Sequence, residues 1–120
     1  MLIFICITRT FVYMNTTESI NALYTRIPRR HNDENVKEIK TIVAEYEDIL
    51  MGIEAVNAFY EKNIPPFFDA VEEINILIKK STDNKASKKT KDIFFDEASV
   101  AMKDNMEALL ELWGNGGRES

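Results

Sequence analysis

One heptad frame with apolar first and fourth positions runs from residue 36 to residue 78 of this chain without a slip. Its first positions are Val36, Val43, Leu50, Asn57, Ile64, Val71 and Ile78, and its fourth positions are Ile39, Tyr46, Ile53, Tyr60, Phe67 and Ile74. Every one of these side chains except Asn57 is apolar or aromatic. Such spacing keeps one face of an α-helix apolar, and that face must be buried against another surface. The frame therefore predicts a protein that packs long helices.

The composition favours a single all-α domain. The chain has 120 residues, of which 45% are hydrophobic and 29% are charged, so it can bury one core and is not expected to be disordered throughout. Only 4 glycines and 3 prolines occur, which is few for an all-β chain with its many turns. We therefore expect an elongated antiparallel helical bundle, or a coiled-coil-like hairpin, of three to four helices.

Apolar periodicity and breaker residues set the bounds of the expected helices. They cover about residues 16–27, 33–63, 66–80 and 91–113. Pro28 ends the first, Asn32 or Asp33 can cap the second, Thr90 or Asp92 can cap the last, and Gly114 suits the position just beyond it. Residues 14–113 then form a single helical domain, and residues 114–120 are expected to be a flexible tail.

The pair Pro65-Pro66 leaves two architectures open. Each proline lacks a backbone N–H and disfavours helical geometry in the preceding residue, so the regular ladder of hydrogen bonds must break there. The chain can continue as one kinked helix from about residue 33 to residue 80, or it can turn a tight corner so that residues 66–80 fold back. Because the heptad frame passes through both prolines in phase, we favour the bend over the reversal.

Two positions in the second expected helix have alternative interpretations. Asn57 is a polar side chain at a first heptad position, where it can fix register or oligomeric state, or it can lie near the proline bend and contact water. Gly52 either lets another helix approach closely or weakens the middle of the helix, at a cost of about 1 kcal/mol. The sequence does not decide between them at either position.

Residues 79–91, KKSTDNKASKKTK, form a lysine-rich stretch between the last two expected helices. They carry six lysines and one acid, and no apolar side chain larger than that of Ala86. This composition predicts a solvated, mobile loop. Contact with nucleic acid or lipid headgroups is a weaker alternative, because no aromatic residue is interleaved for base stacking.

The first 13 residues, MLIFICITRTFVY, differ from the rest of the chain because Arg9 is their only charged side chain. They are too few for a transmembrane span of about 20 apolar residues, and they lack the basic start and small-residue cleavage site of a typical signal peptide. They can form a β-strand or an apolar plug packed on the helices. Alternatively, translation begins at Met14, where Asn15 and Glu18 can cap a helix. We favour the second interpretation and treat residues 1–13 as an extension outside the helical domain.

Charge and cysteine content restrict the class of partner and compartment. A net charge of −5 argues against a general nucleic-acid binder, which needs an excess of Lys and Arg, and it permits an acidic face for a basic partner. Cys6 is the single cysteine and cannot form an internal disulfide, so nothing points to an oxidising compartment. We expect a cytoplasmic or other intracellular protein without a membrane span.

No residue pattern typical of an enzyme or a metal site occurs in the sequence. His31 is the only histidine, and it lies in a polar segment where we expect it to be exposed. A single histidine excludes zinc sites with several histidines and di-iron sites with paired Glu-x-x-His motifs, and the glycine-rich nucleotide-binding motifs are also absent. We therefore predict no catalytic residue, no metal ligand and no cofactor, and we expect no small-molecule substrate.

The leading hypothesis is a non-enzymatic helical protein–protein interaction module. It would be a small complex subunit, adaptor or chaperone that buries the heptad stripe against a protein partner or its own copy. The second helix carries more stripe than the last helix can cover, so we expect Val43, Tyr46, Leu50 and Ile53 to form the interface or lie at its edge. The alternative is an acidic inhibitor, such as an antitoxin or immunity protein, that occupies a basic site on its target, because carboxylates exceed lysines on the second and last helices.

Overall fold

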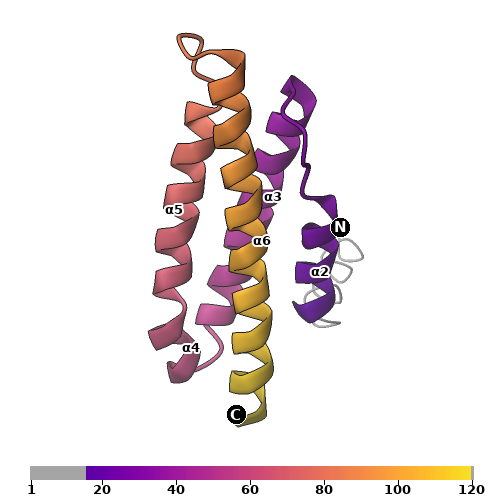
Figure 1. The fold of residues 1–120 in the computed structure, drawn as a ribbon. Coiled ribbons are helices and arrows are strands. Elements are labelled where there is room, and N and C mark those ends of the chain that lie inside the picture. The colour runs from indigo at the N-terminus through magenta and orange to yellow at the C-terminus, as the bar shows by residue number, and fades with distance from the viewer. Residues whose placement is uncertain (1–15, 120) are drawn as a thin grey trace, which may run out of the picture.

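The chain folds into five α-helices over the residues that the structure describes (Figure 1). The structure is a computed structural model that describes residues 16–119, with side chains described for residues 16–113. The helices are α2 (Thr16–Arg26), α3 (Asp33–Glu54), α4 (Ala58–Asn63), α5 (Pro65–Lys80) and α6 (Lys88–Glu119). No strand occurs in this part of the chain, so the all-α prediction is confirmed. The bounds of α2 and α5 match the expected ones within one residue.

The four longer helices surround one hydrophobic core. The main contacts join α2 to α3, α3 to α5, α5 to α6, and α6 back to α2, so each of these helices has two neighbours. Figure 1 shows α3 and α6 running in one direction and α5 in the other. Buried hydrophobic side chains from all five described helices meet in the core. The count exceeds the expected three to four because one predicted helix is divided into α3 and α4.

The predicted heptad stripe is buried inside the chain. All of its apolar members belong to the core except Phe67, which is partly buried and packs against it. Tyr46, Leu50 and Tyr60 are each 0% exposed. Because full burial of a large apolar side chain contributes roughly 1.5–3 kcal/mol, the stripe supplies much of the driving force for folding.

Hydroxyl groups that enter the core are hydrogen bonded. The Tyr46 hydroxyl on α3 donates to Oδ1 of Asn105 on α6, and burial raises the pKa of Tyr46 well above its ordinary value. The Tyr60 hydroxyl on α4 donates to the backbone carbonyl of Trp113 on α6 at 3.1 Å. Among the described residues, no buried side-chain nitrogen or oxygen lacks a hydrogen-bond partner. Since an unpaired buried polar group costs about 1–3 kcal/mol, these bonds help to set the position of α6 against α3 and α4.

The chain reverses at α4 instead of bending at the prolines, so the favoured kink is wrong. α3 ends at Glu54, and a turn leads to Asn57, whose side chain accepts a hydrogen bond from the Tyr60 N–H at 3.0 Å. Pro65 and Pro66 occupy the first turn of α5, where a helix does not use the N–H groups that they lack. α5 then runs back along α3 (Figure 1). The heptad frame continues in phase because both helices face the same core.

The polar break in the stripe has a local cause. Asn57 is the N-cap of α4, with extended φ and ψ angles of −163° and 178°. Asparagine is among the best N-cap residues because its side-chain oxygen satisfies a free N–H of the first turn. Neither sequence interpretation included this role, since both assumed that one helix passed through the position.

The last helix begins earlier and ends later than predicted. Ser87 Oγ accepts a hydrogen bond from the Thr90 N–H at 3.1 Å, so Ser87 caps α6 and neither predicted residue does. This cap shortens the lysine-rich connection to residues 81–87. α6 continues to Glu119, beyond the end expected at Gly114, and no described glycine has the positive φ that a glycine stop requires. Flexibility of the tail stays a prediction.

Leu50 and Met51 are neighbours on α3 with opposite exposures, 0% and 53%. We expect Leu50→Asp to abolish the cooperative unfolding transition, because it places an unpaired carboxylate in the core at a cost of several kcal/mol, against a total stability of about 5–15 kcal/mol. Met51→Asp should shift the thermal midpoint by less than about 4 °C. Thermal unfolding followed by circular dichroism measures both variants. A cooperatively folded Leu50→Asp chain would contradict this core.

Candidate functional site

The four residues predicted to form a partner interface lie inside the molecule. Val43, Tyr46, Leu50 and Ile53 are 2%, 0%, 0% and 2% exposed. The chain's own helices cover this part of α3, which the sequence argument left uncovered. Contact of these side chains with a partner stays a prediction, and it would require the helices to separate. Ile53 nevertheless borders an open surface groove, which is a different candidate site.

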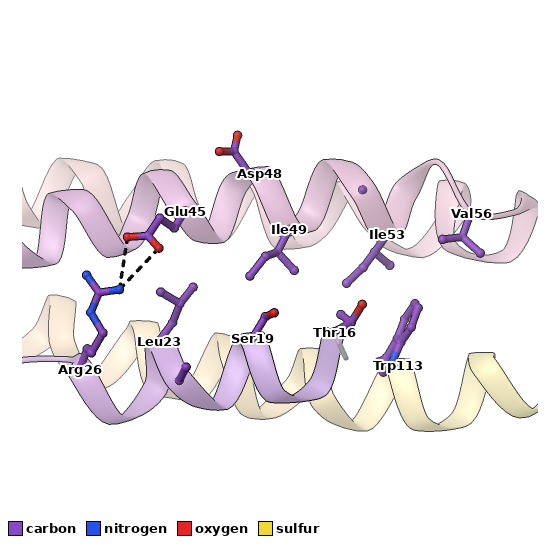
Figure 2. Close-up of a pocket in the computed structure, with 12 residues that line it drawn as sticks. Thr16, Ser19, Leu23, Arg26, Glu45, Asp48, Ile49, Ile53, Val56 and Trp113 are labelled. Carbon is purple, nitrogen blue, oxygen red and sulfur yellow. Dashed lines mark hydrogen bonds and ion pairs between the residues drawn. The ribbon is translucent and has the colours of Figure 1, made fainter. Parts of the chain in front are cut away.

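This groove lies between α2 and α3 and reaches Trp113 of α6 (Figure 2). Its volume of about 670 Å³ is in the range of ligand-binding clefts. The lining residues are Thr16, Ser19, Ala22, Leu23 and Arg26 from α2, Glu45, Asp48, Ile49, Gly52 and Ile53 from α3, Val56 from the following turn, and Trp113. We call it the α2–α3 groove.

Small residues keep the α2–α3 groove open. Ser19 and Ala22 on α2 and Gly52 on α3 line it, at places where larger side chains would interlock and fill the space between two packed helices. A Cβ atom added to Gly52 would meet no other part of the structure within 4 Å. The close approach of another helix, one of the two interpretations of Gly52, is therefore wrong. The glycine instead leaves empty space beside α3.

The floor of the groove is apolar and partly open to solvent. Leu23 and Ile53 are almost fully buried, Ile49 and Trp113 are half-buried, and Val56 is 53% exposed. Figure 2 shows Leu23, Ile49 and Ile53 directed into the space between the two helices. Contiguous apolar surface of this kind is typical of interaction sites, whereas single exposed apolar side chains are ordinary.

An ion-pair cluster marks the end of the groove far from Trp113. Arg26 Nε lies 3.1 Å from Glu38 Oε2, and Arg26 Nη1 lies 3.3 Å from Glu45 Oε2 (Figure 2 shows the second pair). The hydrogen bond to Glu38 is the largest cause that raises the pKa of Arg26. Because these side chains are more than a third exposed, the pairs orient Arg26 more than they stabilise the fold. Asp48, one turn further along α3, adds an exposed carboxylate that Figure 2 shows directed away from α2.

A second hollow, which is polar, lies where the segment after α2 meets the start of α6. Arg29, Arg30, His31, Lys88, Asp92 and Asp96 line it. His31 Nδ1 lies 3.1 Å from Asp92 Oδ1, and Lys88 Nζ donates to Asp92 Oδ2 at 3.0 Å. The His31 side chain is only 16% exposed because its ring packs 5.3 Å from that of Phe95, so the expected exposure of His31 is wrong. Because the two aspartates offset the charge of the cations, the hollow does not have the positive charge expected of an anion-binding site.

Neither a metal site nor a membrane-spanning helix occurs in the part of the chain that the structure describes. Within residues 16–113, no three or more His, Cys, Asp or Glu side chains are placed to hold a metal ion. None of the five helices combines the length and the apolar character needed to cross a bilayer. The predictions that the chain has no catalytic residue and no cofactor stay predictions.

Comparison with known proteins adds no functional information. No protein-family model, no curated protein and no solved structure matches this chain. The geometry and chemistry of the α2–α3 groove are therefore what points to a function.

Sequence reasoning found only part of this groove. Ile49 and Val56 are seven residues apart and directly precede first positions of the heptad frame, so they widen the apolar stripe beyond the part that one core can cover. This widening of the stripe is the sequence feature from which open apolar surface beside α3 could have been predicted. Ser19 and Ala22 gave none, because their small size matters only once α2 has docked beside α3.

Asp92 links the polar hollow to stability in acid. The hydrogen bond from Lys88, followed by the charges of Lys88 and His31, lowers the pKa of the Asp92 carboxyl below its ordinary value of 3.8. A lowered pKa in the folded state gives stability that is present above the ordinary value and is lost as pH falls through the lowered one. Asp92→Asn should therefore flatten the fall of the thermal midpoint below about pH 4. Asp69→Asn on α5 controls for the loss of one charge, and an equal effect in both variants would contradict the assignment.

Proposed function

We propose that this chain is a non-enzymatic helical interaction module, such as a small complex subunit, adaptor or chaperone, that binds an apolar segment of a protein partner or of its own copy in the α2–α3 groove. The observation that supports the proposal is the contiguous apolar floor, which is open to solvent at Ile49, Val56 and Trp113. The heptad stripe is already covered within the chain. We therefore place the partner-binding surface in the groove and not on the heptad stripe.

The lining of the groove favours a helix or an extended segment as the occupant. The groove follows α2 from Thr16 to Arg26, a length of about 15 Å at ~1.5 Å per residue. An occupant that covers its floor gains about 25 cal/mol for each Å² of apolar surface removed from water. The exposed carboxylate of Asp48 on the rim favours a positive charge beside the apolar face of the occupant.

Val56 and Val100 provide matched variants, because they are 53% and 50% exposed and only Val56 lines the groove. Val56→Asp should weaken binding at least about tenfold, or ~1.4 kcal/mol, because a carboxylate must lose water against the apolar floor. Val100→Asp should bind as the parent does. Affinity capture from native lysate, followed by calorimetry with the captured partner, measures partner binding, and light scattering measures self-association. If both variants lose the same affinity, or if neither variant loses affinity, the groove is not the binding site.

A second candidate function is an acidic inhibitor, such as an antitoxin or immunity protein, that occupies a basic site on its target. Exposed carboxylates on α5 and α6 favour it. They belong to Asp69, Glu72, Glu73, Asp96, Glu97, Asp104, Glu107 and Glu111. These side chains lie on helices that do not supply the floor of the groove apart from Trp113, so the two candidates place the partner on different surfaces.

Salt dependence distinguishes the two candidates. Exposed charges are screened within about 8–10 Å at ordinary ionic strength. If the acidic surface binds the target, the affinity measured by calorimetry should fall steeply as salt is raised. If the groove binds it, the affinity should change little, because burial of apolar surface does not depend on screening. If affinity falls steeply with salt and Val56→Asp binds the target as the parent does, the result supports the acidic inhibitor.

A further inference from the structure

We propose that the α2–α3 groove is the docking site of this chain's own N-terminal segment, residues 2–13, which covers the apolar floor until a partner displaces it. The inference rests on the proposed function, because it adds a regulator to the same groove. It takes the interpretation in which residues 1–13 belong to the chain and form an apolar plug packed on the helices, and it sets aside the favoured start of translation at Met14. Residues 1–15 lie outside the described part of the chain. The segment is selected as the occupant by the place where it joins the groove, by its chemistry and by its reach.

The segment joins the chain at the rim of the groove. Thr16 is the first described residue, and it lines the groove at the end where Val56 and Trp113 lie (Figure 2). Only Met14 and Asn15 separate the segment from this rim. So short a tether gives the segment an effective concentration of about millimolar at the groove, so a weak apolar attraction is enough to fill it.

The chemistry of the segment complements that of the groove. Its sequence, LIFICITRTFVY, is apolar or aromatic apart from two threonines and Arg9. The groove offers an apolar floor and a rim that carries Arg26, which is paired with Glu45, and the exposed carboxylate of Asp48. Arg9 is the only charge of the segment, and it has the sign that this rim attracts. An apolar strand or helix with one cation therefore matches an apolar floor with an acidic edge.

The segment is also long enough for its cation to meet that edge. The groove extends about 15 Å along α2, at ~1.5 Å per residue, from Thr16 to the end where Arg26 and Glu45 lie. The chain between Arg9 and Thr16 spans about 11 Å as a helix and up to about 23 Å when extended. The groove length of about 15 Å lies between these two spans, so Arg9 can reach the far end of the groove without movement of the described helices.

Cys6 and the two sides of α2 allow a test on the full chain. Cys6 is the only cysteine, so a nitroxide attached to it labels the segment alone. Glu45 on α3 and Glu107 on α6 both bind the last turn of α2, through Arg26 and Tyr24 respectively, but only Glu45 lines the groove. We expect the nitroxide to broaden the amide NMR signal of Glu45 more strongly than that of Glu107. Equal broadening at both would overturn the inference, because a tethered but undocked segment samples both sides.

A mixed sample distinguishes the chain's own segment from that of a second copy. Spin-labelled chains without isotope are mixed with isotope-labelled Cys6→Ser chains, so any broadening in the observed chain arises from a neighbouring molecule. We expect the Glu45 signal to keep its intensity in this mixture. Selective loss of that signal would assign the occupant to another copy and overturn the inference.

Gly52 offers a matched pair of variants. Gly52→Phe places a ring in the empty space of the groove, so it should displace the segment and restore the Glu45 signal in the spin-labelled chain. Gly52→Ala adds one methyl group where nothing lies within 4 Å, and it should keep the selective broadening. Both variants should fold, because alanine and phenylalanine favour a helix interior over glycine. Unchanged broadening in a folded Gly52→Phe chain would show that the segment lies elsewhere.

Failure of this inference and failure of the proposed function give different results. If Glu45 is not selectively broadened while Val56→Asp still weakens partner binding, the groove binds a partner and the segment is not its occupant. If Glu45 is selectively broadened while Val56→Asp leaves partner capture unchanged, the docking inference holds and the partner function is wrong.

Discussion

Burial of one apolar stripe is the constraint on which the rest of this structure depends. The stripe is shared between α3 and α5, and its two halves can face each other only if the chain reverses between them. α4 supplies that reversal, with Asn57 as its cap and the proline pair opening α5. α6 then packs along α5 and reaches α3 through the hydrogen bond between Tyr46 and Asn105. The surface available for function is what remains after this burial.

The α2–α3 groove is an apolar surface that this burial leaves partly open to solvent. Helix α2 commits Ile20 and Leu23 to the core, yet the positions that it turns toward the groove include the small residues Ser19 and Ala22. Two helices with small residues at their contact leave apolar side chains beneath an open channel, which costs free energy unless something covers it. Each of our two proposals names a segment that would cover this surface: a segment of a partner in one, and the chain's own N-terminal segment in the other. Together they describe a module whose apolar surface is exchanged between its own segment and a partner.

Helix content and core membership could be predicted from the sequence, but connection geometry could not. The stripe identified the buried faces of α3 and α5 because periodicity is a local property of one helix. The sequence left the reversal open but favoured the bend, because a kinked rod and a hairpin can have the same heptad phase and only the docking of α5 on α3 distinguishes them. His31 was expected in solvent because Phe95, which covers it, lies far along the sequence. The cap at Ser87 was missed for a local reason, since several candidate caps lie within a few residues.

The sequence by itself determined that this chain is helical, which side chains enter its core, and that its first 13 residues are chemically distinct. These properties follow from residue type and from spacing within single helices. Only the tertiary structure decided that α5 folds back on α3, that Val43, Tyr46, Leu50 and Ile53 are covered by the chain itself, and that open apolar surface lies instead beside Gly52. The reason is physical: a groove is a property of two helices at a given separation, and that separation is set by side chains far apart in sequence that meet only in the folded chain.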